Sequence, residues 1–350
     1  LEGQNYEVIL VGRQKKNSPP ISQKSFRWKR LKLPFEKGPL FYITLNLRLL
    51  LFLFSNKFDL IYANDLDTLI PCFVAAKIKN SKLIYDTHEL FTEVPELTSR
   101  PRVQKIWLKI ESAIFPKLKH VITVNDSIAQ IYSQKYRIPI TAVRNVPEYH
   151  KLEKDLKTRE QFKLSNDDFI LIIQGSGLNI DRGVEEAVLA MRDCEGCILL
   201  IVGDGDIIPK AKEIVTRNKL DQKVKFISRR PYEELMKITR IADMGLLLDK
   251  NSSLNQELAL PNKLFDYIHA GIPILSSALP EIKKIIKKYD VGIFISKTEP
   301  NIIQKTILSY KANHKLRNQH KENCKLAAER ENWGIEQQKL IDVIVASEQD

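Results

Sequence analysis

The sequence predicts an α/β protein of two domains, each a parallel sheet covered by helices in the manner of a Rossmann fold. Its 350 residues suit two domains, because a domain usually has about 100–200 residues. Short apolar segments alternate with longer segments of helical periodicity, an order typical of right-handed βαβ units. The alternation is interrupted once, between residues 147 and 166, by a charged stretch that follows Pro147. We expect the linker between the domains there.

The first domain is expected to span residues 1–150. A Rossmann-like domain normally opens with a central strand and a glycine-rich turn, whereas here the first strand follows a fragment that resembles a helix end. We therefore expect this domain to lack its first strand and the following helix, a unit of about 30 residues. The predicted strands are 6–11, 58–62, 82–85 and 120–124, and the predicted helices are 40–55, 68–79, 103–117 and 127–135.

The second domain is expected to span residues 151–332, and residues 333–350 are expected to form a C-terminal helix that packs back on the first domain. Two such domains facing each other leave a cleft at the carboxyl ends of both sheets, where ligands bind in open α/β folds. The predicted strands are 169–173, 198–202, 224–227, 244–248, 274–275 and 291–294, and the predicted helices are 184–191, 209–218, 232–240, 263–270 and 280–288.

The composition is that of a globular protein, with 43% hydrophobic and 28% charged residues. These values exclude collagen-like, disordered and disulfide-scaffold proteins. The four cysteines are scattered, which favours a reducing compartment and a cytoplasmic protein. Cys194 and Cys197 form a C-x-x-C pair, which is either a metal or redox site or two partly buried thiols. The polar residues 1–5 show no secretory signal.

The net charge of +12 is concentrated in residues 1–150, which carry 23 Lys and Arg against 13 Asp and Glu. A basic half attracts the phosphates of a nucleic acid, an anionic membrane or a phosphorylated acceptor, although a merely solvated surface has the same composition. The longest apolar run, residues 40–54, contains Arg48 and is shorter than the roughly 18–20 apolar residues of a spanning helix. It predicts a buried or interfacial helix, so an anionic membrane surface is one expected partner.

A glycine-containing loop follows the predicted strand 169–173. Gly175 and Gly177 let the backbone approach a phosphate, and Arg182 places a planar cation just before the next helix. The start of that helix offers unpaired N–H groups and the positive end of its dipole. The loop therefore predicts an anion site, with an ordinary turn as the alternative.

A second candidate lies at the start of the predicted helix 263–270. Asn262 is expected to cap this helix, and Lys263 then lies in its first turn, where a cation is unfavourable unless an anion is bound nearby. Asp266 lies one turn after Asn262, and its carboxylate can accept hydrogen bonds from both hydroxyls of a vicinal diol such as ribose. The alternative is a capped surface helix.

Polar residues also follow two strands of the first domain. His88 and Glu89 come after the strand 82–85, where they can orient hydroxyls or act as acid and base, and Asn64 and Asp65 follow the strand 58–62. Helix capping is the alternative for both groups. No Walker, H-E-x-x-H or G-x-S-x-G motif and no spaced Cys/His set is present, which excludes P-loop NTPases, zincins and α/β-hydrolases.

These residues together resemble the family 4 glycosyltransferases, retaining enzymes of the GT-B fold that use nucleotide sugars without a metal. The resemblance implies that Arg182 and Lys263 bind the donor diphosphate, that Asp266 binds its ribose and that His88 orients the sugar. It further implies donor contacts from Gly175, Gly177, Arg230, Asn262 and Leu264. The motifs that carry it are YANDLDTL at 62–69, YDTHELF at 85–91, VITVNDSIAQ at 121–130, RNVP at 144–147, LIVGDGD at 200–206 and ALPNKLFDYIHAGIPIL at 259–275.

The chain departs from the family pattern at one informative position. Many members have two glutamates eight positions apart, and the first falls on Leu258 here. Either Glu257 replaces it, or backbone amides of the turn 261–263 do so.

The resemblance implies transfer of a sugar, with retention, from a nucleotide diphosphate sugar to a lipid-linked or saccharide acceptor, in surface polysaccharide or glycolipid synthesis. We expect no metal, because no D-x-D motif follows a strand, and no nucleic acid, because no basic and aromatic platform is present. The expected location is the cytoplasm, on the inner face of the cell membrane. A non-catalytic nucleotide-sugar-binding or assembly subunit and a nucleotide-sugar epimerase remain alternatives, because fold does not fix function.

Overall fold

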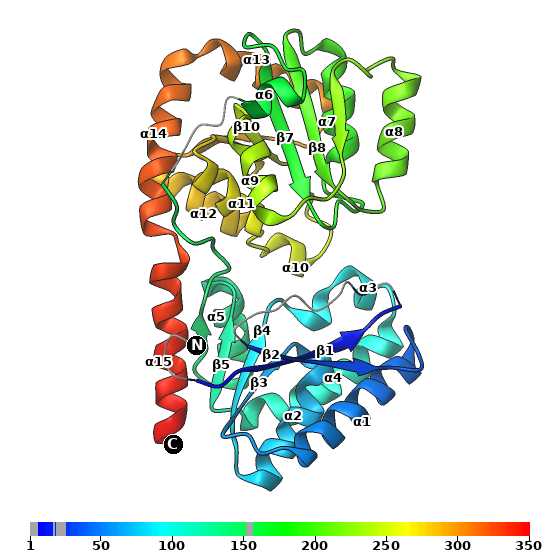
Figure 1. Ribbon diagram of the computed structural model, residues 1–350. Coiled ribbons are helices and arrows are strands. Elements are labelled where there is room, and N and C mark those ends of the chain that lie inside the picture. Colours follow the sequence, from blue (N-terminus) through cyan, green and yellow to red (C-terminus); the bar gives the residue numbers. More distant parts are fainter. Residues whose placement is uncertain (1–5, 17, 19–25, 152–156) are drawn as a thin grey trace. The chain divides into compact units, whose positions relative to one another are not determined.

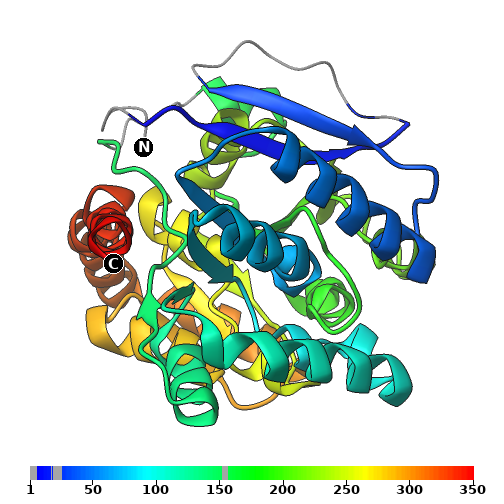
Figure 2. The same cartoon turned by 90° about the horizontal axis from the view of Figure 1, so that it is seen from below.

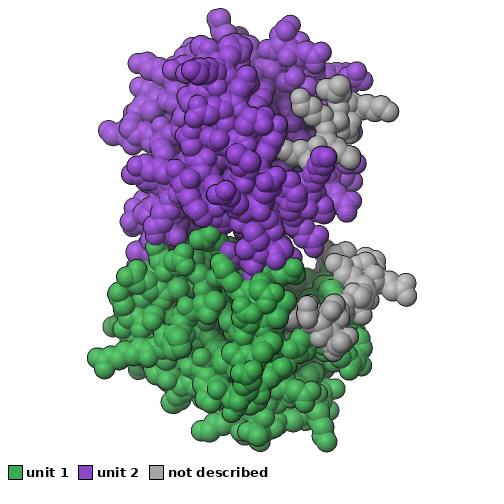
Figure 3. All heavy atoms as spheres, turned by 90° about the vertical axis from the view of Figure 1, so that its left-hand side faces the viewer, with its two compact units in different colours: residues 1–144, 337–350 green, residues 145–336 purple. Residues whose placement is uncertain are grey.

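The computed structural model describes residues 6–16, 18, 26–151 and 157–350 (Figure 1). The chain divides into two compact units: residues 1–144 and 337–350 form unit 1, and residues 145–336 form unit 2 (Figure 3). Each unit contains parallel strands joined by helices, so the predicted α/β class with two domains is confirmed. The polar start at residues 1–5 and residues 152–156 of the expected linker lie outside the described residues.

Unit 2 is built on one six-stranded parallel sheet in the order β12-β11-β10-β7-β8-β9. The chain enters at β7 in the middle of the sheet and proceeds outward to β9. It then restarts on the other side of β7 with β10, so the direction of winding reverses between β7 and β10. The bounds are β7 Phe169–Gly175, β8 Cys197–Gly203, β9 Val224–Ile227, β10 Met244–Leu247, β11 Ile274–Ser277 and β12 Gly292–Ile295.

Helices cover both faces of this sheet, and β7 and β10 are therefore buried on both sides. Helices α7, α8 and α13 pack on one face, and α9, α11, α12 and α14 pack on the other. Helices α13 and α14 were not expected from the sequence. The bounds are α7 Val184–Ala190, α8 Ile208–Arg217, α9 Tyr232–Arg240, α10 Leu254–Glu257, α11 Asn262–Ala270, α12 Pro280–Tyr289, α13 Pro300–Ala312 and α14 His314–Arg330, with a 3-10 turn at Met191–Asp193.

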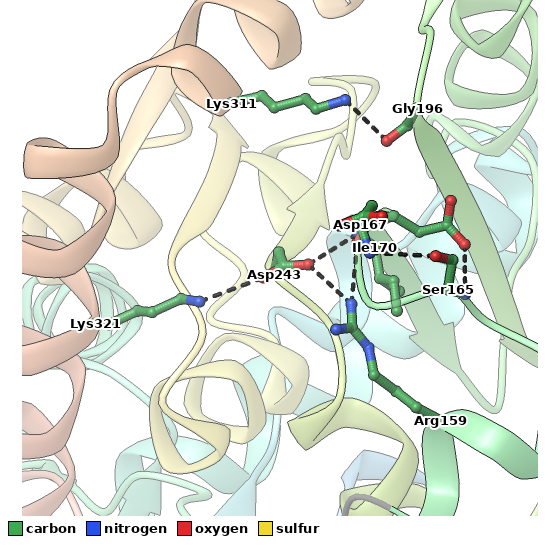
Figure 4. A network of polar contacts seen from close by, with 9 residues as sticks. Arg159, Ser165, Asp167, Ile170, Gly196, Asp243, Lys311 and Lys321 are labelled. Carbon is green, nitrogen blue, oxygen red and sulfur yellow. Dashed lines mark hydrogen bonds and ion pairs between the residues drawn. The ribbon is translucent and has the colours of Figure 1, made fainter.

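Polar side chains form a network of hydrogen bonds and ion pairs at the amino end of this sheet (Figure 4). Asp243 accepts a hydrogen bond from the Ile170 N–H at 3.0 Å, from Lys321 Nζ at 3.3 Å and from Arg159 Nη2 at 3.5 Å. Arg159 belongs to α6 (Lys157–Gln161) and also donates to the Asp168 carbonyl at 3.0 Å. Residues 157–161 of the expected linker therefore form a helix, and the ion pair between Arg159 and Asp243 holds this helix on unit 2.

Unit 1 contains two separate parallel sheets among its described residues. Strand β1 pairs with β2, and the other sheet has the order β3-β4-β5-β6. The first strand begins three residues later than the expected 6–11, and β2 was not expected. The bounds are β1 Ile9–Gln14, β2 Arg27–Lys32, β3 Leu60–Asn64, β4 Lys82–Thr87, β5 His120–Thr123 and β6 Thr141–Ala142.

Three helices of unit 1, α1, α2 and α4, form a layer in which neighbours lie side by side (Figures 1 and 2). Lys79, near the end of α2, donates hydrogen bonds to the Leu53 and Phe54 carbonyls at the end of α1, each at 3.1 Å, and to the Asn56 carbonyl. The bounds are α1 Pro39–Ser55, α2 Leu66–Lys79, α3 Pro95–Thr98, α4 Pro101–Ile114 and α5 Asp126–Tyr136, with 3-10 turns at Phe91–Glu93 and Phe115–Lys117.

From Gln337 onward the last helix, α15 (Trp333–Gln349), belongs to unit 1, and so does the following Asp350. Tyr6 Oη donates to Glu348 Oε1 at 2.8 Å, and His120 Nε2 lies 3.0 Å from Asp350 Oδ2. Cys72, Cys194, Cys197 and Cys324 are all buried free thiols. No helix in the described part of the chain is both long and apolar enough to cross a membrane.

Candidate active site

The loops at the carboxyl edge of the unit 2 sheet hold the first group of candidate residues. Strand β7 ends at Gly175, and the neighbouring strand β10 ends at Leu247. The winding of the sheet reverses between these two strands. In open α/β sheets a ligand binds at such a reversal, because the two loops diverge there and leave a crevice.

The glycine loop is fixed to its neighbours on both sides. The Leu178 N–H donates to the Asp204 carbonyl at 2.9 Å, and the Lys250 N–H donates to the Asp181 carbonyl at 2.8 Å. Gly183 has a φ of +72°, and a Cβ built there would lie 2.3 Å from the Leu248 Cβ. Only glycine suits this conformation and this space. The loop that carries Arg182 is therefore packed closely against the loop that follows β10.

Arg182 and Lys263 converge on one buried carboxylate, Asp249. Arg182 Nη1 lies 2.5 Å from Asp249 Oδ1, and Lys263 Nζ lies 3.1 Å from Asp249 Oδ2. The Asp249 side chain is 4% exposed, and Ser277 Oγ fixes its backbone by donating to its carbonyl at 2.6 Å. Burial raises the pKa of Asp249, but the Lys263 ammonium and the Arg182 guanidinium outweigh it and hold this pKa below its usual range. The cluster of two cations and one anion carries one net positive charge.

The start of α11 differs from the expectation in one respect. Asn262 is the first residue of the helix, and the capping position is occupied by Pro261, whose backbone is extended, so the prediction that Asn262 caps the helix is wrong. No side chain caps α11, which leaves first-turn N–H groups for a ligand. The Leu264 side chain is buried in the core, and its N–H donates to the Pro261 carbonyl.

Asp266, expected to bind a diol, is 8% exposed and already has two partners. Gln174 Nε2 donates to its Oδ2 at 3.0 Å, and Tyr232 Oη donates to its Oδ1 at 3.0 Å. Thr239 Oγ1 donates in turn to Gln174 Oε1 at 2.6 Å, which fixes the orientation of the amide. Burial raises the pKa of Asp266 to about 6, against the hydrogen bonds from Tyr232 and Gln174. A diol can bind Asp266 in place of Tyr232, which is half exposed.

The remaining predicted residues of unit 2 lie at the surface. Gly177 is exposed, and no atom approaches a Cβ built there closer than 3.9 Å. Arg230 is exposed, and its Nη1 lies 4.0 Å from Glu234 Oε2. It lines a surface hollow of about 360 Å³ with Lys163 and Lys225, rather than joining the cluster around Asp249.

In unit 1, His88 lies between two carboxylates, Asp65 directly after β3 and Asp86 near the end of β4. Its Nδ1 is 3.2 Å from Asp86 Oδ1 and 3.9 Å from Asp65 Oδ1. Tyr62 Oη donates to the other oxygen of Asp86 at 2.7 Å. The hydrogen bond to Asp86 raises the pKa of His88 to about 9, with burial opposing and the charges of Asp86 and Asp65 adding to the rise. This raised pKa favours the protonated imidazolium at neutral pH, which donates hydrogen bonds.

A cavity of about 550 Å³ lies in unit 1 between β1, α1 and the start of α2. Arg13 lines it with its guanidinium carbon 4.9 Å from the centre of the Phe41 ring. Asp67 lines it too, and burial, assisted by the charge of Asp65, raises the pKa of Asp67 to about 6. Apolar and titratable side chains line one hollow here, a composition typical of small-molecule sites.

Several of these residues were not predicted from the sequence. Asp249 comes directly after the predicted strand 244–248, and the attention given to polar residues after strands of the first domain, such as Asp65, would have found it. Tyr232 and Gln174 gave no such signal, because their roles follow from packing on Asp266. Among the described residues, no three His, Cys, Asp or Glu side chains are grouped as metal ligands.

Comparison with known proteins gives two family matches. The model of Glycosyltransferase Family 4 matches residues 1–147, and that of Glycosyl transferases group 1 matches residues 155–327. A curated relative, the chitobiosyldiphosphodolichol beta-mannosyltransferase of Candida albicans, is 25% identical over 165 residues. This match covers 44% of the chain and 33% of the relative, so the chain spans about a third of the relative's length.

Several solved structures share the fold. Sucrose-phosphate synthase of Thermosynechococcus elongatus superposes with a TM-score of 0.79 at 17% identity, over 99% of this chain and 90% of its own. HepE of Anabaena, bound to UDP and glucose, gives 0.73 at 15% identity, over 91% and 86% of the two chains. WaaG, a glycosyltransferase of lipopolysaccharide biosynthesis, gives 0.67 at 13% identity, over 94% and 88%. The shared fold is GT-B.

Proposed function

The chain belongs to the family 4 and group 1 glycosyltransferases of the GT-B fold, and from this premise we propose that its donor is a nucleoside diphosphate sugar. The observation that carries the proposal is the convergence of Arg182 and Lys263 on Asp249 at the reversal of the unit 2 sheet. Two cations beside an uncapped helix start form a site for a diphosphate.

The proposed chemistry is mainly the handling of charge. As the bond between the sugar and the diphosphate breaks, negative charge grows on the leaving phosphate. Arg182 and Lys263, fixed in advance by Asp249, stabilise that charge without reorganising. Asp266 holds the ribose hydroxyls after Tyr232 has given up its hydrogen bond. No step in this proposal requires a metal ion, because the two cations supply the positive charge.

His88 is proposed to orient a sugar hydroxyl by donating a hydrogen bond. Its positive charge, stabilised by Asp86 and Asp65, favours the donor role over the base role that the sequence left open. The acceptor hydroxyl attacks the anomeric carbon on the face that the diphosphate leaves and passes its proton to the departing phosphate oxygen, which gives retention. This stereochemical proposal rests on the family resemblance.

We infer a lipid-linked or saccharide acceptor in surface polysaccharide or glycolipid synthesis, reached at the cytoplasmic face of the membrane. Two names support this class: the Candida relative is a mannosyltransferase named for a dolichol-linked chitobiose, and WaaG is a lipopolysaccharide enzyme. The basic character of residues 1–150 agrees with an acceptor that carries phosphate.

The test is a screen of UDP-, GDP-, ADP- and dTDP-sugars for release of the nucleoside diphosphate, with EDTA present. One donor is expected to be consumed, and Arg182→Ala is expected to abolish its consumption. Arg192→Ala is the matched control, because Arg192 is exposed and bonds to Asn218 instead. Failure of every donor to bind or react would overturn the donor proposal, and activity that returns only with Mg²⁺ or Mn²⁺ would overturn metal independence.

A further inference from the structure

Helix α1 presents large apolar side chains on two opposite sides. Phe41, Leu45, Leu49 and Leu53 are buried against unit 1. Five others point outward at steps of three and four residues and are 38–60% exposed; we call them the α1 face: Leu40, Ile43, Leu47, Leu51 and Phe54. A helix at the surface of a globular protein normally carries polar residues on its outer side. An exposed apolar stripe of this length marks an interaction surface.

The helices of the same layer also carry exposed apolar side chains. Ile78 of α2 and Ile106 of α4 are 68% and 59% exposed, respectively. The exposed charged side chains of α1, α2 and α4 are all basic: Arg48, Lys77, Arg102, Lys105 and Lys109.

The two acidic residues of these helices do not offset that charge. Asp67 is half buried and lines the cavity. Glu111 is 1% exposed and accepts hydrogen bonds from Lys135 and Tyr136. The helical layer therefore offers its surroundings apolar and positively charged groups without an exposed acid.

We propose that the α1 face docks this chain onto an anionic lipid surface. The outward side chains enter the boundary between headgroups and acyl chains, and the basic residues approach the lipid phosphates. The opposite side of α1 is packed on unit 1, so only the outward side chains enter the lipid. The inference rests on the proposed function only for the purpose of the docking, which is access to a lipid-linked acceptor. Its test does not depend on catalysis.

Charge and shape favour a lipid surface over other occupants. A second copy would bring one basic layer against another, and like charges repel. A nucleic acid needs stacking or hydrogen-bonding groups, whereas the α1 face is aliphatic apart from Phe54. An acidic protein with an apolar groove would also fit the chemistry and is separated from lipid by the experiment.

The experiment is co-sedimentation of the full chain with vesicles of phosphatidylcholine alone or mixed with phosphatidylglycerol, at low and high salt. We expect binding to the mixed vesicles, weaker at high salt because exposed charges are screened. Leu47→Ser with Leu51→Ser should weaken binding about tenfold or more, since two half-exposed leucines lose their transfer to lipid. Lys105→Gln and Lys109→Gln should each weaken it about fivefold.

Matched controls come from unit 2. Leu326→Ser removes an apolar side chain that is 59% exposed on α14. Lys283→Gln with Lys287→Gln removes two exposed charges on α12. Both controls should bind vesicles like the wild type. In addition, Leu47→Trp should give a blue shift of fluorescence on addition of anionic vesicles that exceeds any shift of the wild type, whose own tryptophans are Trp28, Trp107 and Trp333.

The proposal is overturned if the chain binds neither kind of vesicle, or if the α1 face variants bind as well as the controls. Concentration-dependent self-association that the Leu47 and Leu51 changes abolish, without vesicle binding, would assign the face to a second copy instead. Binding of UDP or GDP, measured by calorimetry without lipid, shows separately whether the donor proposal holds.

Discussion

The charged clusters of the two units have opposite ratios of cations to anions. In unit 2 one buried carboxylate, Asp249, holds two cations, whereas in unit 1 one cation, His88, lies between two carboxylates. The Asp249 side chain is 4% exposed and the His88 side chain is 41% exposed. Burial makes the first cluster rigid and costly to break, and exposure leaves the second adjustable. The first suits a ligand of fixed negative charge, and the second suits hydroxyl groups.

The largest effect is expected from Asp249→Ala. Removing the shared carboxylate leaves Arg182 and Lys263 close together without an anion, and breaking a buried ion pair costs about 3–5 kcal/mol. Urea unfolding should show a loss of stability of this size, partly restored by a nucleoside diphosphate that supplies the missing charge. An unchanged free energy of unfolding would mean that the cluster is not held by Asp249.

Next in size are Arg182→Ala and Lys263→Ala, measured by the binding of a nucleoside diphosphate. Each removes a charge-assisted contact of roughly 1.5–3 kcal/mol, or about 10–150-fold in affinity. Calorimetric titration gives the affinity, and Arg192→Ala should bind like the wild type. Wild-type affinity in either variant would show that the substituted residue does not bind the phosphates.

Asp266→Asn tests the buried neighbour of the cation cluster. The pKa of Asp266 is about 6 in the folded chain and near 3.8 when unperturbed, so the folded state binds more protons between these values. Stability therefore falls as pH rises from about 4 to 6, by roughly 2 kcal/mol. The variant should lack this fall and melt at a higher temperature than the wild type at pH 8. Parallel pH profiles of the two proteins would contradict the shifted pKa.

His88→Gln addresses the cluster of unit 1, where a smaller effect is expected. With a pKa of about 9, against 6.5 when unperturbed, His88 keeps its charge through neutral pH and loses it as pH rises through 9. The variant should lower kcat/KM about fivefold to tenfold, equivalent to about 1 kcal/mol for one exposed donor. An imidazole NMR titration with a midpoint near 6.5 would contradict the assigned charge.

The smallest effect is expected from Arg230→Ala. Its guanidinium is 45% exposed and 4.0 Å from Glu234, and exposed pairs of this kind contribute about 0.5 kcal/mol or less. Its free energy of unfolding should match that of the wild type. A clear loss of donor affinity in this variant alone would extend the donor site to the loop after β9.

The strands of unit 2 could be predicted because a strand buried on both faces is an uninterrupted apolar run. Strand β9 (Val224–Ile227) and helix α9 (Tyr232–Arg240) have the predicted bounds. Strand β2 was missed because its sequence RWKRLK is mostly charged, and α14 was missed because only a narrow stripe around Cys324 and Ala327 is buried.

The candidate site was predictable where it depends on local sequence. The glycine loop and the start of α11 are motifs, and the structure brings Arg182 and Lys263 of these motifs to one carboxylate. That carboxylate, Asp249, is 67 residues from Arg182 along the chain, and no local pattern encodes such a pairing. The bonds that already occupy Asp266 were unpredictable for the same reason.

The lysine that caps α1 has a consequence for how the protein is made. Helix α1 has no basic residue in its own last turn and depends on Lys79 of the next helix. A ribosome adds about 5–20 residues per second, so Lys79 follows the end of α1 by about one to five seconds. Until Lys79 has been synthesised and α2 has packed beside α1, the carbonyls of Leu53 and Phe54 lack this donor. The C-terminal end of α1 is therefore completed only together with α2, so the order of synthesis makes the two helices a folding pair.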